Sequence, residues 1–221
     1  MERDLIIFDC DGTLVDSEYL CNKVIADILA GFGLPQYTAD YCVDHFAGMS
    51  APVALDIISR ETGRTFPPDI VKTYERGVNE NMDQLRFIAG VPETLPRLAE
   101  KYHLCVGSNG ERSTVLLSLK HADIHHHFLD ERVFTKDMVV NAKPAPDLYL
   151  LAAHRMNIPP ARVTVIEDTV TGVTAGKAAG MSVIGITAAY HNKESHTRAL
   201  KAAGAGDVID DFSLLAGLMG I

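Results

Sequence analysis

The chain has 221 residues, of which 47% are hydrophobic and 22% are charged, a composition typical of a globular protein with a substantial core. Its net charge of −9 argues against nucleic acid and anionic membranes as main partners. The start lacks the features of a signal peptide, no apolar run is long enough to cross a bilayer, and the four cysteines have no C-x-x-C or zinc-ligand spacing. We therefore expect a cytoplasmic protein with free thiols and no membrane partner, either a monomer or a weak dimer.

The first predicted element is a strand over residues 5–8. Its four consecutive apolar residues show no polar alternation, which indicates a buried parallel strand. Asp9 and Asp11 follow it and, being two residues apart, project from the same side of an extended backbone. Open α/β sheets bind ligands at the carboxyl ends of their strands, and two acids at such a position predict a bound metal.

The next part of the chain predicts helices only. An apolar stripe at helical spacing marks residues 17–32, and further helical patterns cover 39–46, 51–62 and 68–82, with glycine and proline between them. A block of helices directly after the first strand predicts a separate all-α subdomain over residues 16–85. Its hinges are expected near residues 15–17 and 83–87.

From Phe87 onward the patterns of strands and helices alternate, which predicts a parallel sheet with helices on both faces. The fold class is therefore α/β, with a Rossmann-like three-layer core formed by residues 1–15 and 86–221. The predicted strands cover 103–108, 132–134, 163–166, 182–187 and 207–209, and the predicted helices cover 93–101, 113–120, 146–156, 172–179 and 212–219.

Polar residues follow several of these strands and could meet at one edge of the sheet. They are Ser108 and Asn109, Glu167 and Asp168, and Lys143 in a loop before a proline. Taken singly, each has an ordinary interpretation: a turn, a helix N-cap or a solvated lysine. Their combination with Asp9 and Asp11 favours an enzyme active site.

These residues resemble a known set of motifs. D-x-D-G-T at 9–13, S-N at 108–109, K-P-x-P-D at 143–147 and E-D at 167–168 are similar, in order and spacing, to the four motifs of the haloacid dehalogenase superfamily. The helical insert resembles the α-helical cap of the β-phosphoglucomutase-like and sugar-phosphate phosphatase branch. The resemblance covers essentially the whole chain.

The residue types suit phosphoryl transfer, which needs positive charge around the transferring group. Asp9, Asp168 and the backbone carbonyl of Asp11 could hold Mg²⁺, and Glu167 is either a further ligand or an acceptor behind the ligands. Lys143 would supply a second positive charge.

The remaining motif residues also have expected roles. Ser108 and the backbone beyond Asn109 could hydrogen-bond the phosphate oxygens. Asp9 is the expected nucleophile, forming an aspartyl-phosphate, and Asp11 the expected general acid and base. Dehalogenases of the family lack an acid at the position of Asp11, so the resemblance favours phosphoryl transfer.

The helical insert bears on the substrate. Gly48 and Ser50 match the loop that carries substrate contacts in relatives with this type of cap. Ala47 and Ala51 stand where the β-phosphoglucomutase pattern has basic residues, which weakens the mutase hypothesis because a mutase must hold a second phosphate. Further candidate contacts at the rim are Glu18, Asn22, Arg76, Glu111 and Arg112.

The sequence thus predicts an Mg²⁺-dependent phosphatase that acts on a small phosphate ester, with sugar phosphates as the favoured class. The alternatives are a β-phosphoglucomutase-like phosphotransferase and a non-catalytic phosphate-binding regulatory module. The histidines at 121 and 125–127 could suggest a metal site, but they follow a helix end and favour a solvated turn.

Overall fold

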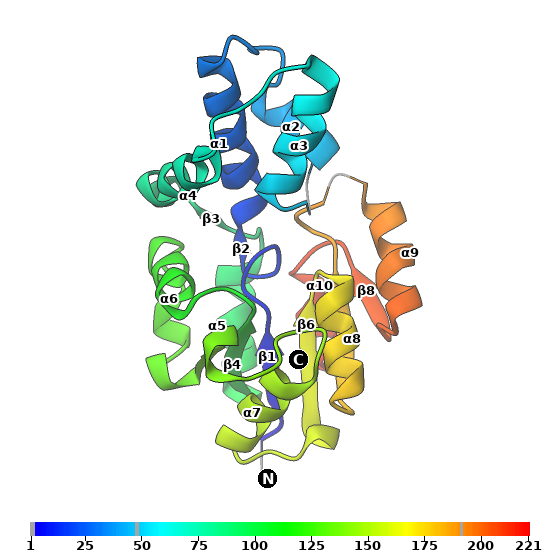
Figure 1. The fold of residues 1–221 in the computed structure, drawn as a ribbon. Helices are drawn as coiled ribbons and strands as arrows, with labels where there is room; N and C mark the ends of the chain where they lie inside the picture. Colours follow the sequence, from blue (N-terminus) through cyan, green and yellow to red (C-terminus); the bar gives the residue numbers. More distant parts are fainter. Residues whose placement is uncertain (1–2, 47–48, 191) are drawn as a thin grey trace. The chain divides into compact units, whose positions relative to one another are not determined.

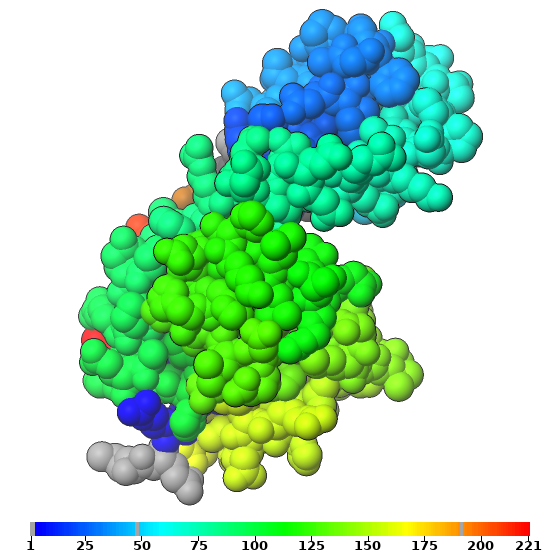
Figure 2. Space-filling view, turned by 90° about the vertical axis from the view of Figure 1, so that its left-hand side faces the viewer, coloured from blue at the N-terminus to red at the C-terminus, as the bar shows by residue number. Residues whose placement is uncertain are grey.

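The computed structural model describes residues 3–46, 49–190 and 192–221. Gly48, one of the predicted substrate-binding residues, lies outside the described residues, as does Ala47. The chain divides into two compact units: a core unit formed by Met1–Asp16 and Arg86–Ile221, and a helical unit formed by Ser17–Leu85. In Figure 2 the dark-blue N-terminal residues lie beside green and yellow segments from much later in the chain, because the core unit is discontinuous in sequence.

The core unit contains a six-stranded parallel sheet in the order β5-β4-β1-β6-β7-β8. The central strand β1 pairs with β4 on one side and β6 on the other, and Phe8 is in register with Val106 and Ile166. The ends of these three strands therefore come level at one edge of the sheet. The strands are β1 (Leu5–Phe8), β4 (His103–Ser108), β5 (Val133–Thr135), β6 (Val163–Glu167), β7 (Ser182–Ile186) and β8 (Asp207–Ile209).

Helices cover both faces of the sheet, which confirms the predicted three-layer α/β class (Figure 1). Side chains of β1 alternate between the faces: Ile7 packs in a cluster with residues of α7, α8 and α9, whereas Phe8 contacts Phe128 and Phe212 on the other side. The helices of the core unit are α5 (Val91–Lys101), α6 (Arg112–His121), α7 (Asp147–Arg155), α8 (Val170–Ala178), α9 (Lys193–Ala203) and α10 (Leu214–Leu218). Its 3-10 turns are η2 (His125–His127), η3 (Asp130–Arg132), η4 (Lys136–Met138) and η5 (Pro160–Arg162).

The helical unit has its own hydrophobic core. Ile25, Leu29, Cys42, Leu55 and Ile58 are buried together in this core. The helices of the unit are α1 (Ser17–Gly31), α2 (Ala39–Phe46), α3 (Ala51–Thr62) and α4 (Ile70–Glu80), followed by η1 (Met82–Gln84). Among the described residues, none of the helices is both long and apolar enough to span a bilayer.

Two short strands join the predicted hinge segments. β2 (Val15–Asp16) pairs with β3 (Arg86–Phe87) in an antiparallel ladder where the chain leaves and re-enters the core unit. The sequence did not predict these strands because two residues are too few to show a period.

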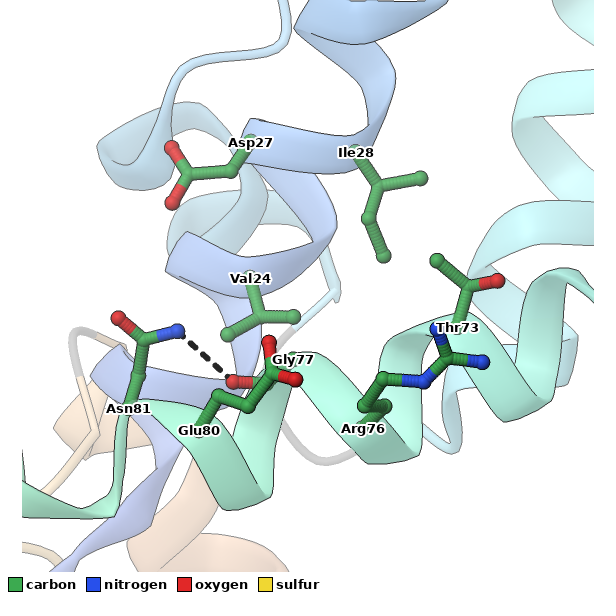
Figure 3. A pocket seen from close by; sticks show the side chains of 8 residues that line it. All are labelled: Val24, Asp27, Ile28, Thr73, Arg76, Gly77, Glu80 and Asn81. Carbon is green, nitrogen blue, oxygen red and sulfur yellow. Dashed lines mark hydrogen bonds between the residues drawn. The ribbon is translucent and has the colours of Figure 1, made fainter.

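The helical unit also carries a pocket of about 350 Å³ between α1 and α4 (Figure 3). Gly77 lets the two helices approach closely, since a Cβ at this position would lie 2.7 Å from Val24 Cγ1. Arg76, a predicted rim contact, lines this pocket together with Val24, Asp27, Ile28, Thr73, Gly77, Glu80 and Asn81. Its lining mixes both charge signs with apolar carbon and does not indicate one type of ligand.

The largest difference from the predicted elements is α9, which the sequence did not predict. Among its eleven residues only Leu200 is buried, so the helix has no apolar stripe from which a period can be read. Instead, the helix begins with Asn192, whose side chain accepts a hydrogen bond from Ser195 N, and ends at Gly204 in the left-handed conformation.

Candidate active site

The loop after β1 places its two acids in different surroundings. Asp9 is buried and Asp11 is exposed, although they are two residues apart. Gly12 then turns the chain with φ +73°, and a Cβ there would lie 2.1 Å from Asp168 Oδ2. Only glycine fits this position, because the turn needs a positive φ and the carboxylate of Asp168 lies against the backbone.

Lys143 lies among buried acids. Its Nζ is 2.5 Å from Asp9 Oδ1 and 2.8 Å from Glu167 Oε1, and it lies 4.6 Å from the ring centroid of Tyr149. Lys143 is the only buried basic side chain among the described residues. The structure thus brings Lys143, from the loop before α7, to the ends of β1 and β6.

Both carboxylate oxygens of Glu167 are already engaged. Oε1 accepts from Lys143 Nζ and, at 3.2 Å, from Tyr149 OH, while Oε2 accepts from Thr169 N at 2.6 Å and Thr169 Oγ1 at 2.9 Å. Gly172 makes room for this side chain, because a Cβ there would lie 1.6 Å from Oε1. Through these contacts Glu167 accepts hydrogen bonds from Lys143, Tyr149 and Thr169 and helps to hold the Lys143 ammonium in place.

Asp168 has a different set of partners. Thr13 Oγ1 donates to Oδ1 at 3.0 Å, and Tyr190 OH donates to Oδ2 at 2.9 Å. The Nε2 of His196 donates to the main-chain oxygen of Asp168. Among the described residues, the hydrogen bonds to Asp168 come from two hydroxyls and the ring N–H of His196, and none comes from a lysine or an arginine.

Ser108 and Asn109 follow β4 at the same edge. Ser108 is buried, and its Oγ accepts from Gly110 N at 3.0 Å, which leaves the hydroxyl proton able to donate. The side chain of Asn109 forms two hydrogen bonds with the main chain of Lys143, each 3.1 Å long. Asn109 therefore fixes the loop that carries Lys143, a role the sequence did not predict.

Burial and mutual repulsion dominate the electrostatics of this cluster. Burial raises the pKa of Asp9 to about 7, with Lys143 opposing the shift and Glu167 and Asp11 adding to it. Burial and the charges of Glu167 and Asp9 raise the pKa of Asp168 well above its ordinary value. Burial alone would lower the pKa of Lys143, but Asp9 and Glu167 raise it well above its usual value. The cluster therefore contains three buried acids, Asp9, Glu167 and Asp168, and one buried lysine.

The donor set fits a hard cation. Among the described residues no three His, Cys, Asp or Glu side chains form a ready-made metal site. However, Asp9 and Asp168 are oxygen donors whose charges repel each other, and of these two acids Lys143 makes an ion pair with Asp9 and not with Asp168. Buried carboxylates in excess of their counter-charge are the environment that a divalent cation stabilises, and an all-oxygen set suits Mg²⁺.

Two of the predicted rim contacts, Arg112 and Glu111, interact with other parts of the core unit. Arg112 donates to the main-chain oxygens of Val133 and Asp130, so it holds β5 and its preceding turn. Glu111 forms a 3.0 Å ion pair with Lys136.

The remaining rim candidates lie in the helical unit. Ser50 is exposed just before α3. Asn22 is buried on α1, and its Nδ2 donates to the main-chain oxygen and the carboxylate of Glu18.

Five residues beside these acids were not assigned from the sequence: Thr13, Tyr149, Thr169, Tyr190 and His196. Thr13, Tyr149 and Thr169 lie within or next to the recognised motifs, so motif position could have drawn attention to them. Tyr190 and His196 lie beyond the last motif, and no local pattern distinguishes them.

Comparisons with known proteins give the family. The model of a family described as haloacid dehalogenase-like hydrolase matches residues 6–186. The 6-phosphogluconate phosphatase of Escherichia coli (strain K12) is 31% identical over 192 residues, covering 86% of this chain and 85% of the relative. The fructose-1-phosphate phosphatase of the same organism is 29% identical over 185 residues, covering 82% and 95%.

A solved structure agrees with these relatives. The HAD family hydrolase from Deinococcus radiodurans R1, which contains bound phosphate and sodium, has a TM-score of 0.85 and 33% identity. The match covers 98% of this chain and 95% of that one. This chain belongs to the haloacid dehalogenase-like hydrolase family.

Proposed function

We propose that this protein is an Mg²⁺-dependent phosphatase whose substrate is a small phosphorylated metabolite, with sugar phosphates as the favoured class. Phosphoric monoester hydrolysis is the activity of the named relatives reported above. The observation that carries the proposal is the cluster of Asp9, Lys143 and Asp168 at the carboxyl ends of β1 and β6. It supplies a nucleophile, a fixed positive charge and a second acid for a cation.

Asp9 is the proposed nucleophile. One of its carboxylate oxygens attacks phosphorus, and the bond between phosphorus and the ester oxygen breaks, which leaves an aspartyl-phosphate. Lys143, 2.5 Å from Asp9 Oδ1, provides positive charge beside the transferring group. Ser108 would donate its hydroxyl proton to a phosphate oxygen.

Asp11 is the proposed general acid and base. Its side chain is exposed, which allows it to reach a leaving group and water. It gives a proton to the departing alkoxide, then takes a proton from the water that attacks the aspartyl-phosphate. Inorganic phosphate leaves, and the carboxylate of Asp9 is restored.

The proposed metal ligands are Asp9, Asp168 and the main-chain carbonyl of Asp11. When bound, Mg²⁺ would neutralise the negative charge that develops on the phosphoryl oxygens. Because both oxygens of Glu167 are engaged, we assign it to hold Lys143 and not to the metal. Asn109 is assigned to hold the Lys143 loop and not to bind phosphate through its side chain.

The helical unit is the proposed cap, hinged at the segments around β2 and β3. In this role residues 16–85 would contact the leaving group, with Gly48 and Ser50 as the proposed contacts. A cap that excludes water during the first step would favour transfer to Asp9 over direct hydrolysis.

The test is release of inorganic phosphate from a panel of sugar phosphates, with and without Mg²⁺. We expect hydrolysis that requires Mg²⁺, and we expect Asp9→Asn to lower the rate to background. Asp11→Asn should lower kcat by about 10²- to 10⁴-fold, the usual contribution of a general acid and base.

Two outcomes would overturn this proposal. If the wild-type protein releases no more phosphate than Asp9→Asn, the protein is a phosphate-binding module. If a hexose 1-phosphate with a bisphosphate primer yields the 6-phosphate without free phosphate, the protein is a mutase.

A further inference from the structure

Two aromatic residues outside the four motifs contact Asp168. Tyr190 OH donates to Asp168 Oδ2 at 2.9 Å, and His196 Nε2 donates to the main-chain oxygen of the same residue. The two rings stack on each other, with centroids 3.6 Å apart and an interplanar angle of 17°. Together they contact both the side chain and the backbone of one acid.

The two rings come from segments that are anchored separately. Tyr190 follows β7 in a turn closed by its own N–H donating to Thr187 O at 3.1 Å, and Thr187 N donates to Ile209 O at 2.9 Å. His196 lies in the first turn of α9, which Asn192 caps. The stacked pair therefore joins the β7 loop and α9 to the end of β6.

This arrangement fixes the carboxylate of Asp168 on both sides. Thr13 donates to Oδ1 and Tyr190 to Oδ2, so rotation about the bond that carries the carboxylate would break one hydrogen bond or the other. Each carboxylate oxygen has two lone pairs, and each keeps one for a cation. Hydrogen-bond partners of ligating carboxylates commonly set metal affinity in this way.

We propose that Tyr190 and His196 are positioning residues that hold Asp168 in the orientation that binds Mg²⁺, and so set the metal affinity of the site. The inference rests on the metal site of the proposed function. Tyr190 acts through its hydroxyl, and His196 acts by stacking on the Tyr190 ring and by holding the backbone of Asp168. Neither residue touches the substrate in this proposal.

The test is calorimetric titration of metal-stripped protein with MgCl₂. Tyr190→Phe removes one hydroxyl and keeps the ring that stacks on His196. We expect its Kd for Mg²⁺ to rise by about 10-fold, within the range for residues that orient a metal ligand. In a phosphatase assay the half-saturating Mg²⁺ concentration should rise equally, whereas kcat at saturating Mg²⁺ should stay within about two-fold of wild type.

Variants of His196 separate its two contacts. His196→Phe keeps a ring for stacking and loses the hydrogen bond, whereas His196→Ala loses both contacts. We expect the Kd for Mg²⁺ to rise in the order wild type, His196→Phe, His196→Ala.

The matched control is Tyr37→Phe. Tyr37 OH also donates to a carboxylate, Glu61 Oε2 at 3.2 Å, but in the helical unit. This variant should bind Mg²⁺ as the wild type does.

The outcomes keep the two proposals apart. If the wild-type protein itself does not bind Mg²⁺, the metal dependence in the proposed function fails. If the wild-type protein binds Mg²⁺ and Tyr190→Phe binds it equally well, with circular dichroism spectra that match, the positioning role is wrong. An equal change in Tyr37→Phe would also overturn the inference, because the effect would then not be specific to Asp168.

Discussion

Glu167 and Asp168 are neighbours in sequence at the end of β6, yet the structure balances their charges differently. Glu167 belongs to a lysine side of the site, where Lys143 forms ion pairs with it and with Asp9. Asp168 belongs to a hydroxyl side, where Thr13 and Tyr190 donate hydrogen bonds. Hydroxyls solvate a charge without cancelling it, so the hydroxyl side keeps negative charge for a cation and the lysine side does not.

The two sides of the site also differ in how far the cost of burying an acid is recovered. An ion pair in the interior recovers part of the cost of desolvation only when its partners are well placed and hydrogen-bonded. On the lysine side, Tyr149 and Thr169 complete the hydrogen bonds of Glu167. On the hydroxyl side, the proposed cation would relieve the part of the desolvation cost that the hydroxyls do not recover.

The largest expected effect on stability comes from removing the lysine of the lysine side. Lys143→Met leaves Asp9 and Glu167 buried without a counter-charge, and we expect a loss of about 3–5 kcal/mol in the free energy of unfolding. Chemical denaturation in EDTA measures it. Lys136→Met is the control, because its ion pair with Glu111 is exposed and should contribute about 1 kcal/mol at most. A loss no larger than that of the control would refute the assigned role of Lys143.

Substitutions of two glycines test the lysine side and the hydroxyl side separately. Gly172→Ala places a Cβ against Glu167, and Gly12→Ala places one against Asp168 in a backbone conformation that disfavours alanine. Each should cost about 1–3 kcal/mol by overpacking. Gly12→Ala should also weaken Mg²⁺ binding, measured by calorimetry, whereas Gly172→Ala should affect it less. Gly217→Ala, whose new Cβ has no atom within 4 Å apart from its chain neighbours and the backbone of its own helix, should not destabilise the protein.

The smallest expected effect concerns the hydroxyl side and depends on pH. Because the pKa of Asp168 is raised in the folded state, the folded protein holds this proton more tightly than the unfolded chain. The stability that this gives is complete below the ordinary pKa of 3.8 and is lost as pH rises towards the folded-state value. Asp168→Asn should therefore stabilise the metal-free protein at pH 8, because it removes the buried charge.

Thermal denaturation in EDTA at several pH values measures this gain. It should shrink as pH falls towards 4, and added Mg²⁺ should stabilise the wild type but not the variant. A variant that is less stable than the wild type at pH 8 would show that the hydroxyls balance Asp168 fully.

Much of this protein could be predicted from local pattern. The apolar run at Leu5–Phe8 specified a buried parallel strand. The acids that follow it indicated which edge of the sheet would carry the functional site. The strand and helix alternation after Phe87 specified the layered core. The amphipathic stripe in α1 specified a helix. Each of these depends on residues that are near one another in the chain.

The sequence by itself therefore determined the α/β class and the identities of the acids and the lysine. Tertiary structure alone decided which partner each acid has, because strand register and helix packing bring distant residues together. Lys143 reaches Asp9 across 134 residues, and Tyr190 reaches Asp168 across 22. His196 reaches Asp168 across 28, from a helix whose polar sequence carries no period. The local spacing of residues cannot predict such contacts, because they depend on the packing of the whole unit.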